Sequence, residues 1–205
     1  MSFMYKEITH FMLSATKMEI AENRKKQLQQ LIAYLQQKIN TKQKIRLQFI
    51  CTHNSRRSIL AQVWAQTLAF YFNIDMLFCY SGGTEETAVY PFIIKTLNET
   101  GFLIQQLSLG ENPVYAIKFS KNEQPIIAFS KKTDAVFNPE NKFAAIMTCS
   151  EAETACPIIK GAEKRIPLPY NDPKKYDDTL LQKEKYQERN RQIAGELFYV
   201  FSRLK

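Results

Sequence analysis

The sequence predicts an α/β fold in which a parallel sheet is covered by helices on both faces. Apolar runs of strand length alternate along the chain with stretches in which apolar residues recur at intervals of three and four. Strand–helix–strand alternation of this kind is typical of parallel sheets. A composition of 45% hydrophobic and 23% charged residues is that of an ordinary globular protein, and 205 residues suffice for one domain with a sizeable core.

The first half of the chain alternates helices and strands. Apolar residues at helical spacing predict an amphipathic helix rich in Gln and Lys over about 17–39. The segment 44–50 alternates and then turns fully apolar, which predicts a strand entering the core. Helical spacing returns over 58–73. A short apolar run at 75–80, a glycine turn and a helix over about 85–99 follow.

The second half predicts more strands and one long helix. Residues 114–119 and 125–129 have the composition of two strands, and 142–147 predicts another buried strand. The final element is a helix over about 178–204 with apolar residues on one side. The chain contains no internal repeat and no low-complexity segment.

Composition also excludes several classes of function. No run approaches the roughly 18 apolar residues of a membrane span, and the N-terminus lacks the features of a signal peptide. We therefore expect a cytoplasmic protein with no membrane partner. The net charge is +8, but the basic residues are scattered, which favours solvated surfaces over a nucleic-acid site. No cofactor is predicted, and the sequence does not indicate the oligomeric state.

Four cysteines are too few for a disulfide scaffold in a chain of this length. In a cytosolic protein they are more often catalytic, redox-active or buried. Cys79 lies within an apolar run and is expected to be buried and inert. Cys51, in contrast, ends the strand at 44–50, and Arg57 follows six residues later where the helical pattern begins.

This placement of Cys51 and Arg57 predicts a nucleophile within an anion site. A loop between a strand and a helix N-terminus turns backbone N–H groups inward, and the helix dipole favours negative charge there. Arg57 can bind a tetrahedral oxyanion bidentately and favours the thiolate of Cys51. Ser58 can hydrogen-bond the sulfur and Asn54 can brace the loop. The alternative is that Cys51 is a buried structural thiol.

The run Cys51-Thr52-His53-Asn54-Ser55-Arg56-Arg57-Ser58 resembles the phosphate-binding loop of low-molecular-weight protein tyrosine phosphatases. It also resembles the loop of the thioredoxin-coupled arsenate reductases that share their fold, and the chain resembles these reductases most closely within the superfamily. The resemblance covers about residues 44–204 and implies a three-layer α/β/α fold with a central parallel, mostly four-stranded sheet. It implies that Cys51 is the nucleophile and Arg57 the oxyanion ligand, with oxyanion binding or loop support from Thr52, His53, Asn54, Ser55, Arg56 and Ser58.

Two positions depart from the family loop. His53 stands where the family usually has glycine, which tolerates φ values that His rarely adopts. Arg56 replaces a second cysteine and adds local positive charge. The stretch Ser81-Gly82-Gly83-Thr84 also resembles the family's Ser-Ala-Gly-Thr turn, although a plain strand-to-helix turn explains it equally well.

The resemblance divides the chain into an N-terminal helical extension, 1–43, and a catalytic domain, 44–205, in which 118–142 is an insertion. Asp172-Pro173 precedes the final helix, where the family's Asp-Pro pair supplies the general acid. That role requires a site that keeps the carboxyl protonated until the leaving oxygen needs it. Asp177 and Asp178 are chemical rivals, and Asp before Pro is also a common turn former.

Cys149 and Cys156 distinguish the two branches of the family. Ser150 and Glu153 form a capping box that predicts a short helix from residue 150. Seven residues of helix span about 10 Å, whereas a disulfide needs Cα atoms within about 7 Å, so bonding the two cysteines would require unwinding. Arsenate reductases carry a cysteine pair at this separation and place, and plain phosphatases lack it. One alternative is that the two cysteines are unrelated thiols. A zinc site is the other, but Cys-x6-Cys is an unusual zinc spacing and the chain has only two histidines. No metal is predicted.

The leading hypothesis is a thioredoxin-coupled arsenate reductase. In it, Cys51 attacks arsenate, Asp172 protonates the departing oxygen, and Cys149 and Cys156 form a disulfide that a thioredoxin-like reductant reduces. The second hypothesis is a phosphatase that hydrolyses phosphomonoesters through a phosphocysteine. The third is a non-catalytic module that binds a small oxyanion or a phosphoprotein.

Overall fold

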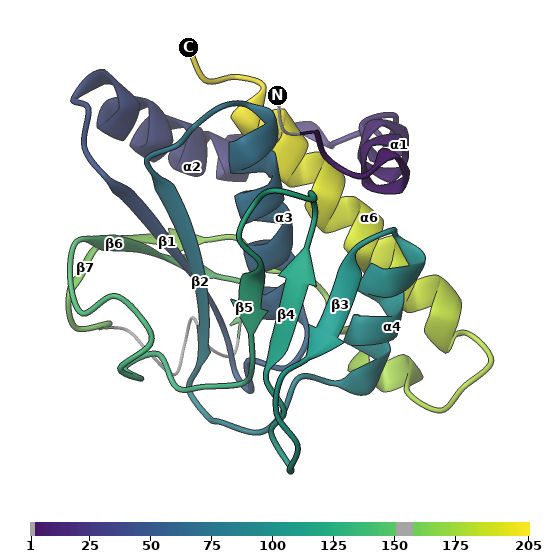
Figure 1. The fold of residues 1–205 in the computed structure, drawn as a ribbon. Helices are drawn as coiled ribbons and strands as arrows, with labels where there is room; N and C mark the ends of the chain where they lie inside the picture. The colour runs from purple at the N-terminus through teal and green to yellow at the C-terminus, as the bar shows by residue number, and fades with distance from the viewer. Residues whose placement is uncertain (1–2, 151–157) are drawn as a thin grey trace.

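The computed structural model describes residues 3–150 and 158–205, and its centre is a four-stranded parallel sheet (Figure 1). The strands lie in the order β2-β1-β6-β7. Their bounds are Ile45–Cys51 for β1, Leu77–Gly83 for β2, Phe143–Met147 for β6 and Ala162–Pro167 for β7. Because the chain continues from β1 to one side of the sheet and later to the other, the carboxyl end of β1 lies at a switch point. Open α/β sheets bind ligands at such points.

Strand β1 is buried at six of its seven positions because both of its faces are covered. Leu47 and Phe49 belong to the large core, and Ile50 and Cys51 belong to a second, smaller buried cluster. Two long helices, α3 (Arg57–Tyr71) and α6 (Gln182–Phe201), pack against each other over the large core, where Trp64 and Tyr186 are completely buried. A central parallel sheet flanked by helices confirms the predicted fold class.

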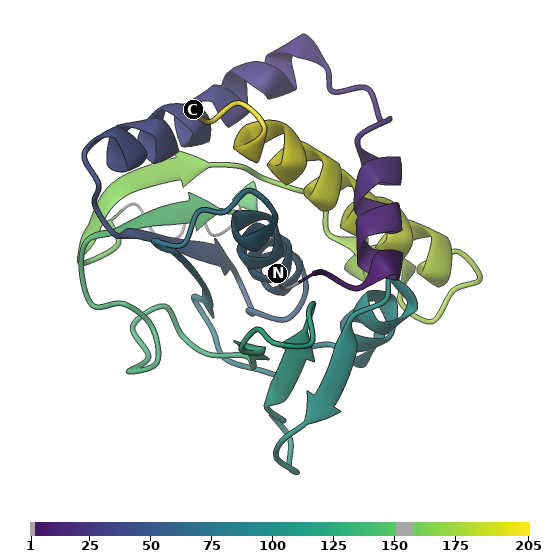
Figure 2. The ribbon, with the colours of Figure 1, turned by 45° about the horizontal axis from the view of Figure 1, so that its top comes forward.

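A second, antiparallel sheet lies beside β2 in the order β3-β4-β5 (Figure 2). Its strands are Leu103–Gln106 for β3, Tyr115–Lys118 for β4 and Ile126–Ala128 for β5. The last two were predicted; β3 was not, and it begins before residue 118, where the sequence resemblance placed the start of an insertion. Gln62 of α3 joins the two sheets, since its amide nitrogen donates to Cys79 O on β2 at 3.3 Å and to Ile127 O on β5 at 3.2 Å.

The N-terminal region forms two helices instead of one, α1 (Lys6–Ala15) and α2 (Glu22–Asn40). Phe11 of α1 stacks on Trp64 at 5.7 Å between ring centroids. Arg24 of α2 forms an ion pair of 2.8 Å with Glu196 of α6. The buried residues of both helices belong to the same core cluster as Leu47 and Phe49. The hydrophobic core therefore continues across residue 43.

The remaining helices are shorter than predicted. α4 spans Pro91–Glu99 because Pro91 occupies its first turn, and a 3₁₀ turn, η1 (Pro173–Tyr176), precedes α6. The short helix expected from Ser150 falls on residues 151–157, outside the described residues. Within the two described stretches, no helix is both long enough and apolar enough to cross a bilayer.

Candidate active site

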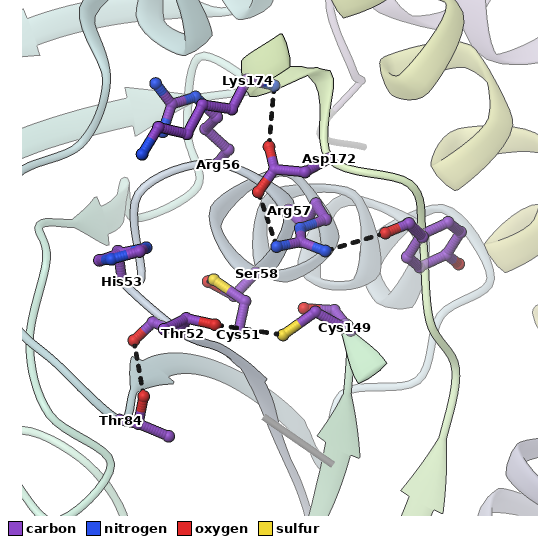
Figure 3. A network of polar contacts seen from close by, with 12 residues as sticks. Cys51, Thr52, His53, Arg56, Arg57, Ser58, Thr84, Cys149, Asp172 and Lys174 are labelled. Atoms are coloured by element: carbon purple, nitrogen blue, oxygen red, sulfur yellow. Dashed lines mark hydrogen bonds and ion pairs between the residues drawn. The ribbon is translucent and has the colours of Figure 1, made fainter. Parts of the chain in front are cut away.

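The loop from Cys51 to Arg57 connects β1 to α3 at the carboxyl edge of the main sheet (Figure 3). Cys51 is the last residue of β1 and Arg57 is the first of α3, so the strand-to-helix placement expected from the sequence is correct. Cys51 is 3% exposed and Arg57 is 6% exposed. The thiol and the guanidinium group are therefore shielded from bulk water, which strengthens their interaction with an anion.

The carbonyl groups of this loop accept hydrogen bonds from the segments that surround it. Thr84 N donates to Cys51 O at 3.3 Å and Glu85 N donates to Thr52 O at 2.9 Å. Further out, the Ser130 hydroxyl donates to His53 O at 2.8 Å, and Ser55 O accepts a bond of 3.1 Å from Tyr90 N. Carbonyls directed outward leave the loop amides available to an anion at the centre of the loop.

Gly83, at the end of β2, allows the loop to approach this closely. A Cβ atom at Gly83 would lie 2.6 Å from Thr52 O, 2.8 Å from Asn54 N and 2.5 Å from Glu85 O. Those atoms are backbone and cannot move aside cheaply. The Ser81-Gly82-Gly83-Thr84 stretch therefore does more than connect a strand to the next segment. The backbone of the nucleophile loop packs directly against Gly83.

Asn54 and Ser58 connect this support to the nucleophile. Asn54 has φ +46°, a left-handed conformation that Asn tolerates better than most residues. Its amide nitrogen donates to Ser58 Oγ at 2.8 Å, and its Oδ1 accepts a bond of 3.0 Å from Lys131 N. Since Ser58 Oγ accepts from Asn54, its own proton can be donated to Cys51 Sγ, 3.1 Å away. A hydroxyl donating to sulfur favours the thiolate.

Arg57 links the loop to the acid candidate. Its Nη2 donates to Asp172 Oδ2 at 2.6 Å, and its Nη1 donates to Tyr170 O at 3.0 Å. Figure 3 shows the Arg57 and Asp172 side chains pointing toward each other above the loop. Asp172 also accepts a bond of 2.9 Å from Lys174 N through its Oδ1. The structure thus places Asp172 at the loop.

Cys149 follows β6 and lies beside the nucleophile loop. Its Sγ is 3.6 Å from Thr52 Oγ1, and it is fully buried in the cluster that also contains Cys51. Cys156, its expected partner, lies outside the described residues. Cys79 is 8% exposed on β2, and burial raises the pKa of its thiol well above the usual value, in keeping with an inert cysteine.

The two departures from the family loop have partners that the sequence did not indicate. His53 Nε2 lies 3.2 Å from Glu85 Oε2, at the rim of the loop. Arg56 donates from Nη2 to Asp177 Oδ2 at 2.6 Å and from Nε to the Tyr186 hydroxyl at 2.7 Å. The guanidinium group of Arg56 is therefore bonded to the segment that precedes α6.

The sequence did not indicate Ser130 and Lys131, which hydrogen-bond to His53 and Asn54 of the nucleophile loop. Lys131 is 1% exposed, and its ammonium group lies 4.3 Å from the Phe129 ring centroid and 3.4 Å from Ser81 Oγ. Burial lowers the pKa of Lys131 from its usual 10.5 to about 8. Nothing in the local sequence marks these residues. Across residues 3–150 and 158–205, no group of three or more His, Cys, Asp or Glu side chains is arranged to hold a metal ion.

The fold is shared with enzymes of known structure. A low-molecular-weight phosphotyrosine phosphatase from Vibrio cholerae O395 aligns with a TM-score of 0.51 and 12% identity, over 77% of this chain and 94% of that one. An arsenate reductase in a phosphate-binding state aligns with a TM-score of 0.50 and 17% identity, over 78% of this chain and 99% of that one. The chain therefore shares the fold of these enzymes.

The sequence adds a relative within this class. An arsenate reductase of Bacillus licheniformis is 27% identical over 158 residues, which cover 75% of this chain and 92% of the relative. No family model matches the sequence. The sequence relative and the shared fold confirm the resemblance to the superfamily, and the similar proteins are enzymes.

Proposed function

We propose that this protein is an arsenate reductase in which Cys51 is the nucleophile and Cys149 and Cys156 form a disulfide relay. The proposal is supported by a second buried thiol beside the nucleophile loop, that of Cys149, and by the arsenate reductase of Bacillus licheniformis among its relatives. The position of Cys149 is the observation that carries it, because a nucleophile and an oxyanion site alone would serve phosphate and arsenate equally.

In the first step, the Cys51 thiolate attacks the arsenic atom of arsenate held by the loop amides and Arg57. A sulfur–arsenic bond forms and an arsenic–oxygen bond breaks. Asp172 gives its proton to the departing hydroxyl group of arsenate, which leaves as water. The contacts that support this step are the bonds from Ser58 Oγ to Cys51 Sγ and from Arg57 to Asp172.

In the second step, the Cys149 thiolate attacks Cys51 Sγ. A Cys51–Cys149 disulfide forms, the electron pair of the sulfur–arsenic bond passes to arsenic, and As(V) is reduced to As(III) as arsenite leaves. Cys156 then attacks Cys149 Sγ, which restores the Cys51 thiolate and leaves a Cys149–Cys156 disulfide. A dithiol reductant of the thioredoxin type supplies the two electrons that reduce this disulfide.

A phosphatase is the second candidate. The same attack by Cys51 on a phosphomonoester gives a phosphocysteine that water hydrolyses, and Cys149 then has no role. The observation that favours it is the shared fold with the Vibrio cholerae phosphatase. In this reaction Asp172, which is hydrogen-bonded to Arg57, would protonate the alcohol leaving group.

The test measures turnover of arsenate with a thioredoxin system, and of an aryl phosphate, in the wild type and in Cys149→Ala. The relay predicts that Cys149→Ala abolishes multiple turnover of arsenate and leaves aryl phosphate hydrolysis intact. Cys79→Ala is the matched control, because Cys79 is also a buried thiol but lies on β2, in a different cluster from Cys51 and Cys149. Arsenate turnover that survives Cys149→Ala would refute the relay, and turnover of neither substrate by the wild type would favour a binding module.

A further inference from the structure

Arg56 stands inside the nucleophile loop but its guanidinium group is bonded elsewhere. Arg56 donates to Asp177 and to Tyr186, and its guanidinium carbon lies 4.0 Å from the centroid of the Tyr90 ring. The Tyr186 hydroxyl in turn donates to Asp177 Oδ1. Arg56, Asp177 and Tyr186 thus form a closed triangle of hydrogen bonds, which we call the Arg56 clamp.

The clamp is well shielded, so its bonds are stronger than those of a surface pair. Arg56 is 9% exposed and Tyr186 is 0% exposed. Burial alone would lower the pKa of Arg56, but its hydrogen bond to Tyr186 and the charge of Asp177 raise it above the usual value. Arg56 therefore stays charged, and its charge is balanced by a carboxylate at 2.6 Å. The Nε and Nη2 atoms of Arg56 thus donate to protein groups, and a substrate anion would have to compete with Tyr186 and Asp177 for them.

The clamp holds the segment that carries Asp172. Asp172 caps η1 by accepting from Lys174 N. Asp177 directly follows η1, and its own N–H donates to Lys174 O at 2.9 Å. Asp172 and Asp177 are thus the two ends of a single hydrogen-bonded turn. Fixing Asp177 fixes the position of Asp172.

Two successive arginines, Arg56 and Arg57, therefore form ion pairs with the two ends of one turn. Arg57 bonds to Asp172 and Arg56 bonds to Asp177. The Arg57 bond must loosen when an oxyanion takes over part of the guanidinium group. The bonds of Arg56 need not loosen in this way, because its partners are all protein groups: Tyr90 just before α4, Asp177 just after η1 and Tyr186 of α6.

We propose that Arg56 is a positioning residue, which keeps the general acid Asp172 over the nucleophile loop through Asp177 while Arg57 is engaged by the oxyanion. The inference rests on the proposed function, since it assumes that Asp172 donates a proton during turnover. It assigns Arg56 a role different from that of an oxyanion ligand. Loss of the clamp should therefore lower the rate of proton donation and leave oxyanion affinity unchanged.

The test uses Asp177→Asn and Arg56→Lys. Asp177→Asn keeps the shape of the side chain but removes its charge, and Arg56→Lys keeps the charge but lacks the planar fork. We expect both to lower kcat by about 10- to 100-fold, the cost of a misplaced catalytic group. The Kd for inorganic phosphate, measured by calorimetry, should not change. A Kd that weakens in step with kcat would make Arg56 an oxyanion ligand and overturn the proposal.

The leaving group provides a readout that a merely structural role would not move. A poor leaving group, as in phenyl phosphate, depends on the general acid more than a good one, as in p-nitrophenyl phosphate. The clamp variants should lose more activity on phenyl phosphate. Equal losses on both substrates would show that the clamp acts on something other than the acid.

Asp178→Asn is the matched control, since it makes the same carboxylate-to-amide change at the next residue, which is exposed. It should behave as the wild type, and a loss equal to that of Asp177→Asn would refute the clamp. The double variant Arg56→Lys/Asp177→Asn should be no worse than either single variant, because each breaks the same link. A wild type that turns over neither arsenate nor aryl phosphate would remove the proposed function itself, whereas an active wild type with fully active clamp variants would overturn only this inference.

Discussion

Arg57 and Asp172, the expected oxyanion ligand and the expected proton donor, are hydrogen-bonded to each other at 2.6 Å. An oxyanion that enters the loop meets a guanidinium group already facing a carboxylate. Binding must therefore redistribute the donors of Arg57 between the protein and the substrate. The Nη1 bond to Tyr170 O can persist meanwhile, because it comes from the other nitrogen of the fork.

Arg57→Lys tests whether the planar guanidinium group of Arg57 is needed to bind the oxyanion. A lysine keeps the positive charge but offers one compact donor group in place of a planar fork. We expect the Kd for phosphate and arsenate to weaken by at least about tenfold and kcat/KM to fall by about 10²- to 10³-fold. Calorimetry with inorganic phosphate and steady-state kinetics measure the two effects. An unchanged Kd would mean that the loop amides alone bind the oxyanion.

Asp172→Asn should lower catalysis without weakening oxyanion binding. The amide cannot give up a proton, so kcat should fall by about 10²- to 10⁴-fold. Removing a carboxylate that competes for Arg57 should at the same time tighten the binding of phosphate. Full activity of Asp172→Asn would transfer the acid role to another group, for which Asp177 is a poor candidate because it is held by Arg56 and Tyr186.

Gly83→Ala should displace the nucleophile loop, because Gly83 packs against its backbone. The added methyl group would lie 2.6 Å from Thr52 O, so the loop must shift, and overpacking of this kind costs about 1–3 kcal/mol. We expect a loss of arsenate and aryl phosphate turnover alongside the lower melting temperature. Gly110→Ala is the control: with φ +112° it is strained as well, but nothing lies within 4 Å of its new methyl group. Gly110→Ala should lose stability alone, and equal activity of both variants would contradict the close approach.

Lys131→Met should alter how stability depends on pH. Since burial lowers the pKa of Lys131 from 10.5 to about 8, the unfolded chain binds a proton between these values that the folded protein has released. Wild-type stability then gains a contribution as pH rises from 8 to 10.5, whereas Lys131→Met lacks it. At pH 7 the variant gains up to about 3 kcal/mol, at about 1.4 kcal/mol for each pH unit.

Urea unfolding of both proteins at pH 7, 8.5 and 10 measures this difference. The advantage of Lys131→Met should shrink steadily over that series, because all other titrating groups are common to the two proteins. An advantage that stays constant with pH would show that the ammonium group is not destabilised by burial.

The sequence allowed the central elements to be predicted because their signals are local. β6 is apolar throughout, apolar residues predominate in β1 and α3, and the Cys51–Arg57 spacing lies within one loop. β3 escaped prediction because it is mostly exposed and shows no alternation. β7, at the edge of the main sheet, carries three charged residues in six and has only one buried position, Ile166.

The parts of the site that were missed are those created by tertiary contact. Lys131 reaches Asn54 through its backbone N–H, which any non-proline residue would supply. Arg56 meets Asp177 across 121 residues and Tyr186 across 130. From the sequence, the charge of Arg56 looked available to an anion. In the structure, its guanidinium group is bonded to Asp177. No pattern of spacing could have revealed these partners.

Support from distant residues has a consequence for the order of folding. The bonds from Ser130 to His53 and from Lys131 to Asn54 each join residues 77 positions apart, and non-local contacts form late because closing a long loop costs entropy. Helix formation in α3 needs none of them. During refolding we therefore expect helical circular dichroism to return before enzymatic activity, with the nucleophile loop as the last part of the molecule to acquire its native shape.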